Sequence, residues 1–136
     1  MSPVSHERGV GVSLNTSGLP WICLFRNAAI DDLRLPEAVW RQSGDAHHHI
    51  YNQFSVRTPR RDALQAHFKN AGIGTEVYYP VPLHEQKCFA DLGYSATSFP
   101  LSHRAAGEAL ALPIYPELTD AQILHVVETA VSFFRA

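Results

Sequence analysis

The last stretch of the chain has the clearest hydrophobic pattern. Apolar side chains between positions 123 and 134 recur three or four residues apart, which is the spacing of one buried helix face. Thr119 and Gln122 have the spacing of a capping box, and Leu118 and Ile123 can pack as a hydrophobic staple. The pattern therefore predicts a C-terminal helix that begins after Thr119. Its inward positions are Ile123, Val126, Val127, Ala130, Val131 and Phe134.

A strand is predicted over residues 49–57, where apolar and polar side chains alternate. Ile50, Phe54 and Val56 fall on one face of this segment, and a period of two is typical of a half-buried strand. Asn52 falls on the same face as the apolar residues.

Two further strands are predicted nearer the C-terminus. Residues 73–79 alternate in the same way, and two prolines directly after them end the strand because proline cannot donate a ladder hydrogen bond. Residues 111–114 form a third short apolar run, and Pro113 within it indicates an edge position in the sheet.

Helices are predicted between these strands. Thr58 can cap a first helix, and Pro59 suits its first position because the missing N–H costs nothing there. Gly72 supplies the left-handed stop of that helix. A short helix over residues 84–92 closes at a glycine, and another starts at a proline and covers residues 100–109. The inward stripe of the first helix consists of Leu64, Phe68 and Ala71.

The order of these elements predicts an α/β fold of two layers, with a small open sheet of about three strands and helices packed on it. Residues 1–32 are rich in glycine, serine and proline and are interpreted as a poorly specified N-terminal arm. A compact apolar run, Trp21–Phe25, could form a short strand within it. The folded domain is therefore expected over residues 33–136.

Composition narrows the class of protein. The 136 residues suffice for one domain, and 46% of them are hydrophobic. The net charge of −2 argues against binding to nucleic acid or to acidic membranes, which needs a basic surplus. No apolar run approaches the length of a membrane-spanning helix, and the first residues lack a signal-peptide pattern. Two distant cysteines fit a reducing compartment, so a cytoplasmic location is expected.

An ordered set of short motifs resembles the C-terminal small domain of the DegT/DnrJ/StrS family of sugar aminotransferases. No single motif is diagnostic, but their order and spacing together are specific, and they cover residues 33–136. The matching pieces are Leu35-Pro36, His49-Ile50-Tyr51-Asn52-Gln53-Phe54, Val56-Arg57, Arg61-Asp62-Ala63-Leu64, Ala71 to Pro80, Pro82-Leu83-His84, Phe99-Pro100, Leu110 to Pro116 and Leu118-Thr119. His103 departs from the family, which often has an acidic residue there.

The resemblance implies a fold-type-I enzyme that uses pyridoxal phosphate (PLP) to transfer an amino group, usually from glutamate, to a keto-sugar nucleotide. It also implies a homodimer, and a preceding large domain that carries the lysine to which PLP binds. The chain has two lysines, Lys69 and Lys87, and both are expected to lie on the solvated surface. We therefore expect no PLP bound to this chain alone and no amino transfer by it, as for a truncated or split enzyme.

The segment Tyr78–His84 is the strongest candidate for a functional site. Its prolines stiffen a turn after a strand and so hold a hydroxyl and an imidazole in fixed positions. By resemblance, Tyr78 and His84 are assigned as contacts to the substrate, with Asn52 as a weaker third. The competing interpretation is that the tyrosines only pack and that His84 caps the next helix.

Other polar residues have less specific interpretations. Arg57 and Arg61 could bind a carboxylate or phosphate, but surface ion pairs with Asp62 or Glu76 are the favoured interpretation. The run His47–His49 could suggest a metal, yet adjacent side chains of an extended segment point to opposite faces, so no metal site is expected.

A second hypothesis for the whole chain is a non-catalytic interaction domain. A small domain without its large domain would leave apolar surface exposed, and such surface favours self-association or docking on a large-domain partner.

Overall fold

The computed structural model of the chain describes residues 19–39, 42, 49 and 51–136. Its sheet has two antiparallel strands, β1 (Phe54–Arg57) and β2 (Ala109–Leu112), in a register that pairs Phe54 with Leu112. Isolated bridges extend the sheet on both sides, from Arg34 to β1 and from Glu76 to β2. The predicted class of a small sheet with packed helices is confirmed, with two strands and two flanking bridges in place of about three strands.

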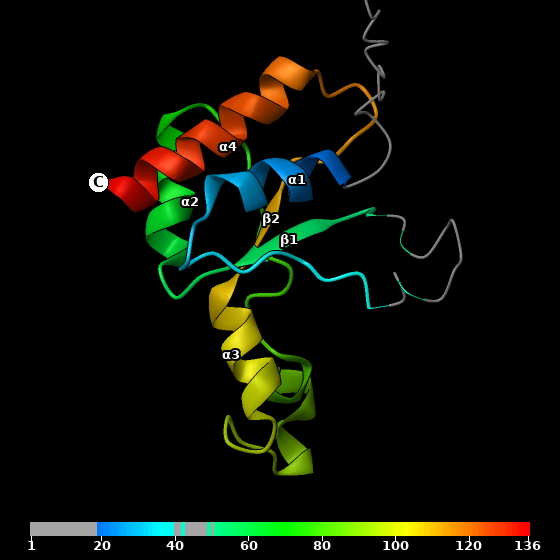
Figure 1. Cartoon of the computed structure of the whole chain (residues 1–136). Helices are drawn as coiled ribbons and strands as arrows, with labels where there is room; N and C mark the ends of the chain where they lie inside the picture. The colour runs from blue at the N-terminus through cyan, green and yellow to red at the C-terminus, as the bar shows by residue number, and fades with distance from the viewer. Residues whose placement is uncertain (1–18, 40–41, 43–48, 50) are drawn as a thin grey trace, which may run out of the picture.

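Three helices gather around this sheet. They are α1 (Leu19–Ala28), α2 (Arg61–Asn70) and α4 (Asp120–Arg135), and α4 packs against both of the others (Figure 1). The capping box of α4 forms as predicted, because Thr119 Oγ1 accepts a hydrogen bond from the Gln122 backbone N–H while the Gln122 side chain accepts one from the Thr119 backbone. Among the described residues, no helix is long and apolar enough to cross a membrane.

Helix α1 corrects an interpretation of the sequence. Trp21–Phe25 belongs to this helix and not to a strand, and three of its side chains are buried in the core. The Trp21 and Phe25 rings stack on Phe54 of β1, with centroids 5.5 and 6.4 Å apart. Residues 19–28 therefore share one core with the residues that follow, while residues 1–18 lie outside the described part of the chain.

The predicted strand over residues 73–79 is wrong as a continuous strand. Only Glu76 pairs with the sheet, through two backbone hydrogen bonds to Ala111 of 3.1 and 2.7 Å. This pairing also places β2 between two neighbours, so β2 is not the edge strand that Pro113 suggested. Pro113 lies just beyond the last paired residue of β2, where its missing N–H removes no ladder bond.

Helix α2 begins two residues later than predicted. Arg60 occupies the N-cap position, and the Thr58 hydroxyl accepts a hydrogen bond from the Arg60 N–H at 3.2 Å. The end of α2 is as predicted, since Gly72 has φ +75° and adopts the left-handed conformation that favours glycine.

A lobe formed by residues 78–108 projects from the sheet on the side away from α4 (Figure 1). It contains two short 3₁₀ helices, η1 (Leu83–Glu85) and η2 (Lys87–Leu92), followed by α3 (Pro100–Glu108). The predicted short helix over residues 84–92 is therefore two 3₁₀ turns, and Gly93 closes the second with φ +71°. The predicted helix from Pro100 is confirmed.

Candidate functional site

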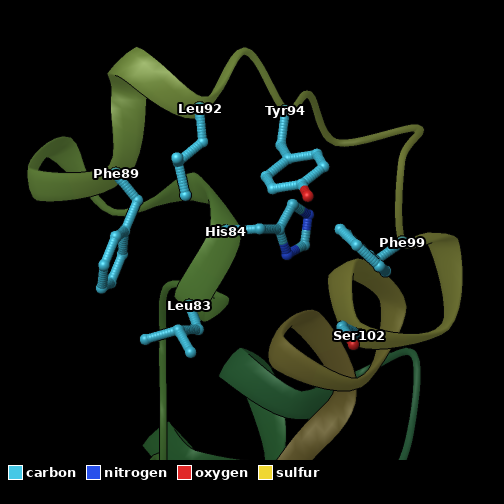
Figure 2. Close-up of a pocket in the computed structure, with 7 residues that line it drawn as sticks. All are labelled: Leu83, His84, Phe89, Leu92, Tyr94, Phe99 and Ser102. Atoms are coloured by element: carbon cyan, nitrogen blue, oxygen red, sulfur yellow. The ribbon is translucent and has the colours of Figure 1, made fainter.

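The lobe has two adjoining hollows that share Leu83 and Ser102. The smaller, of about 340 Å³, lies between η1, η2 and α3, and Figure 2 shows its lining side chains. The larger, of about 560 Å³, lies between residues 78–86 and the α3 helix. Together they form one largely apolar surface on the lobe.

The two strongest sequence candidates line these hollows. Tyr78 lines the larger hollow and is 48% exposed, so its ring is open to a ligand. His84 lines the smaller hollow, where its side chain is only 9% exposed. The structure therefore brings Tyr78 and His84 to two halves of one surface.

Asn52 does not join them. It is exposed in a bend before β1, because the strand begins at Phe54 and not at residue 49. Its predicted place on the apolar face of the strand is wrong. Asn52 lines neither hollow of the lobe.

The imidazole of His84 packs edge-on against Phe99, with ring centroids 4.8 Å apart, and Figure 2 shows it between Tyr94 and Phe99. Its Nε2 atom is buried and lies 3.3 Å from Glu85 Oε1, without the geometry of a hydrogen bond. His84 lies inside η1 and caps no helix, since the caps of η1 and η2 lack side-chain hydrogen bonds. The competing interpretation of His84 as a cap is therefore wrong.

Glu85 connects the two sides of the smaller hollow. Its Oε1 atom contacts His103 Nδ1 of α3 at 2.8 Å. Sequence reasoning missed Glu85, although its position directly after His84 and the basic residue at 103 were both visible. The pairing across 18 residues could be known only from the fold.

Arg57 and Arg61 have structural partners. Arg61 pairs with the exposed Asp62, as expected, and its Nη1 also donates to the carbonyls of Ala106 and Ala109 at 3.1 and 3.2 Å. Arg57 pairs with Glu108 at 2.8 Å and not with Glu76, whose backbone is engaged with β2. Neither arginine lines a hollow of the lobe.

A third hollow, of about 660 Å³, lies between the end of α2 and the start of α4 and holds none of the sequence candidates. Within the described part of the chain, no group of three or more histidine, cysteine or acidic side chains could hold a metal. His47 and His48 lie outside the described residues, so the structure says nothing of them.

The lysines of the chain lie away from the hollows of the described structure. An amine for the cofactor aldehyde would have to come from Lys69 or Lys87, the two lysines of the chain. Both are exposed, Lys69 near the end of α2 and Lys87 at the start of η2, and neither lines any of the three hollows.

Similar proteins carry the same segment within much longer chains. A "pleiotropic regulatory protein" of Geobacillus stearothermophilus is 48% identical over 91 residues, which are 67% of this chain and 24% of the relative. A UDP-N-acetyl-3-dehydro-α-D-glucosamine 3-aminotransferase of Acidithiobacillus ferrooxidans is 37% identical over 95 residues, covering 70% of this chain and 24% of the relative. The chain thus spans about a quarter of the length of these curated relatives.

The fold has counterparts among solved structures. DesV of Streptomyces venezuelae, in complex with a ketimine intermediate, superposes with a TM-score of 0.71 and 28% identity, over 85% of this chain and 31% of DesV. An aminotransferase from Brucella abortus superposes with a TM-score of 0.66 and 26% identity, over 82% of this chain and 29% of that one. Residues 27–131 match the DegT/DnrJ/EryC1/StrS aminotransferase family, so the chain belongs to this family of PLP-dependent sugar aminotransferases.

Proposed function

We propose that this chain serves as the small domain of a sugar aminotransferase that moves an amino group from glutamate to a keto-sugar nucleotide. The observation that carries the proposal is the family match over residues 27–131. Relatives named for amino transfer to nucleotide sugars, and the superposition on DesV, support it. The proposal includes a homodimeric working enzyme in the cytoplasm.

The second part of the proposal is that these 136 residues do not transfer an amino group alone. Neither Lys69 nor Lys87 lies at a hollow, and an isolated exposed lysine lacks the groups that would position a cofactor. The lysine-bearing large domain would then be supplied from outside these residues. This chain contributes a wall of the substrate site.

The third part concerns that wall. Tyr78 can donate a hydrogen bond from its hydroxyl to a sugar or phosphate oxygen without rearrangement, because its ring is half exposed. His84 would need its aromatic neighbours to move before Nε2 could reach a ligand, since that atom is enclosed. Asn52 stays a weaker candidate whose amide is open to solvent. We propose Tyr78 as the principal contact of the three.

A chimera tests the family function. Residues 27–131 would replace the matching quarter of the Acidithiobacillus aminotransferase, and amino transfer from glutamate would be measured by product chromatography. We expect the folded chimera to retain transfer, and Tyr78→Phe within it to raise KM. Phe keeps the ring and removes only the hydroxyl, while Tyr115→Phe, at a tyrosine remote from the lobe, is the matched control. A folded but inactive chimera would contradict the proposal.

The chain alone tests the second part. Purified protein would be incubated with PLP and glutamate, reduced with borohydride and analysed by peptide mass spectrometry. We expect no stoichiometric adduct on either lysine and no transfer. A specific adduct on Lys69 or Lys87 that Lys→Arg removes, together with turnover, would show that the chain is a complete enzyme.

A second candidate function is a non-catalytic interaction domain that self-associates or docks on a large-domain partner. The observation that favours it is the set of exposed apolar side chains on the lobe, where Tyr79 is 74% and Leu83 is 67% exposed. Binding of the chain to an intact family member, measured by calorimetry without any substrate, tests this role separately from catalysis.

A further inference from the structure

The carboxylate of Glu85 lies between two imidazoles of the lobe. Its Oε1 atom is 2.8 Å from His103 Nδ1 of α3 and 3.3 Å from His84 Nε2 within η1. The His84 side chain is 9% exposed and that of Glu85 is 24% exposed, so solvent screens their contact only in part. The acidic residue that the family often has at position 103 would repel Glu85, so this arrangement depends on the histidine of this chain.

Glu85 determines which nitrogen of each imidazole carries the proton. An ionised carboxylate can only accept hydrogen bonds, and a neutral imidazole has one nitrogen that donates and one that accepts. His103 must therefore carry a proton on Nδ1 to donate to Glu85 at 2.8 Å. His84 Nε2 is enclosed and has no hydrogen-bond partner in the described structure. A proton on that atom is attracted by Glu85 Oε1, whereas a lone pair there would be repelled.

The other ring nitrogen of His84 is then an acceptor. Of the two nitrogens in this ring, Nε2 alone is both enclosed and without a partner among the described residues. No hydrogen bond joins Nδ1 to another described residue, so Nδ1 is the nitrogen left accessible to a ligand. Figure 2 shows the imidazole extending from η1 toward Tyr94 and Phe99 in the smaller hollow. An acceptor in this position fits a ligand group that has a proton to donate.

We propose that Glu85 is a positioning residue that keeps the His84 proton on Nε2, so that Nδ1 accepts a hydrogen bond from a hydroxyl group of the substrate. A hydroxyl can donate to such an acceptor, whereas a keto oxygen or an ionised phosphate oxygen cannot. His84 therefore distinguishes hydroxyl groups from these oxygens and complements Tyr78, whose own hydroxyl can donate to them. The contact with a substrate rests on the proposed function, while the position of the proton depends only on the lobe.

The ring nitrogens of the whole chain test the position of the proton. NMR spectra of the isotopically labelled protein at about pH 8, above the ordinary titration range of histidine, distinguish protonated from unprotonated ring nitrogens. We expect the proton on Nε2 of His84 and on Nδ1 of His103. A proton on Nδ1 of His84, or an equal mixture of its two forms, would overturn the inference.

Substitution of Glu85 shows whether its carboxylate causes this preference. Glu85→Gln keeps the shape of the side chain, but an amide can donate as well as accept, so His84 and His103 should both shift toward mixtures of the two forms. Asp91→Asn is the matched control, since Asp91 is an exposed acid of η2 that forms no ion pair with a described residue, and it should leave both rings unchanged. Circular dichroism checks that both variants fold. Unchanged rings in folded Glu85→Gln would refute the positioning role.

The chimera with the Acidithiobacillus aminotransferase tests the hydroxyl contact. Glu85→Gln within it should raise KM for the keto-sugar nucleotide about three- to tenfold and leave kcat within about twofold, because a hydrogen bond to the bound substrate is weakened. Among substrate analogues that each lack one hydroxyl, one should show no difference between the two proteins. An effect that persists with every analogue, or no effect at all, would overturn the hydroxyl contact. An inactive chimera would contradict the proposed function and with it this contact, but not the position of the proton.

Discussion

Two arginines at the start of α2, Arg60 and Arg61, make structural contacts. Arg61 is nearly buried and ties the start of α2 to the end of α3 by donating to two carbonyls. The guanidinium of Arg60, at the N-cap of α2, lies 4.2 Å from the centroid of the Phe133 ring near the end of α4. This cation–π contact joins the start of α2 to the end of α4. The sequence showed the charges but not these acceptors, because backbone carbonyls leave no mark in a residue pattern.

Arg61→Ala should lower the free energy of unfolding by about 2 kcal/mol. The change leaves the carbonyls of Ala106 and Ala109 without their charged donor, and hydrogen bonds to charged groups carry more than neutral ones. Urea unfolding followed by circular dichroism measures the loss. Asp62→Asn is the control, since the Asp62 side chain is 87% exposed and its surface pair with Arg61 contributes little. Equal losses in both variants would contradict the role given to the carbonyls.

The elements with local signals were predictable, whereas those defined by distant partners were not. Helix α4 has its capping box and apolar stripe within its own sequence, and α2 ends at a glycine that must be left-handed. Helix α1 was missed because Pro20 suggested a break and an unbroken apolar run gives no period. The run at residues 73–79 alternates like a strand, but only Glu76 finds a pairing partner on β2.

Phe25→Ala tests the place of α1 in the core. Phe25 is 3% exposed and stacks with Trp21 and Phe54, so truncation removes a large apolar side chain and leaves a cavity. We expect a loss of about 3–5 kcal/mol in the free energy of unfolding. Cys23→Ser, on the exposed side of the same helix, should change it by less than about 0.5 kcal/mol. A small effect of Phe25→Ala would mean that α1 is not part of the folded core.

Thr119→Ala tests the start of α4. The substitution removes the acceptor for the Gln122 N–H, and loss of an N-cap typically costs about 1 kcal/mol. Thr119→Ser retains the hydroxyl and should stay close to the original stability. Thermal unfolding compares the two variants, and an identical midpoint for alanine and serine would show that the capping box contributes nothing.

At the scale of the whole molecule, the chain combines a well-packed core with a sparsely anchored lobe. The core joins α1, α2, α4 and both strands, and the largest fully buried side chains come from it. No residue of η1, η2 or α3 is buried in the described structure. Family motifs predicted that Tyr78 and His84 would matter, but only the fold shows that they meet on an apolar surface shared with α3. Sequence alone therefore named two candidate residues that the fold brings to one surface, and it did not supply the shape of that surface.

This difference in packing predicts a difference in local stability. Amide hydrogen exchange should be fast in η1 and η2 and slow in β1, β2 and the buried turns of α2 and α4, because few buried contacts oppose opening of the lobe. Exchange mass spectrometry at low protein concentration measures the intrinsic opening. Uniform protection of core and lobe in the dilute protein would contradict the packing argument.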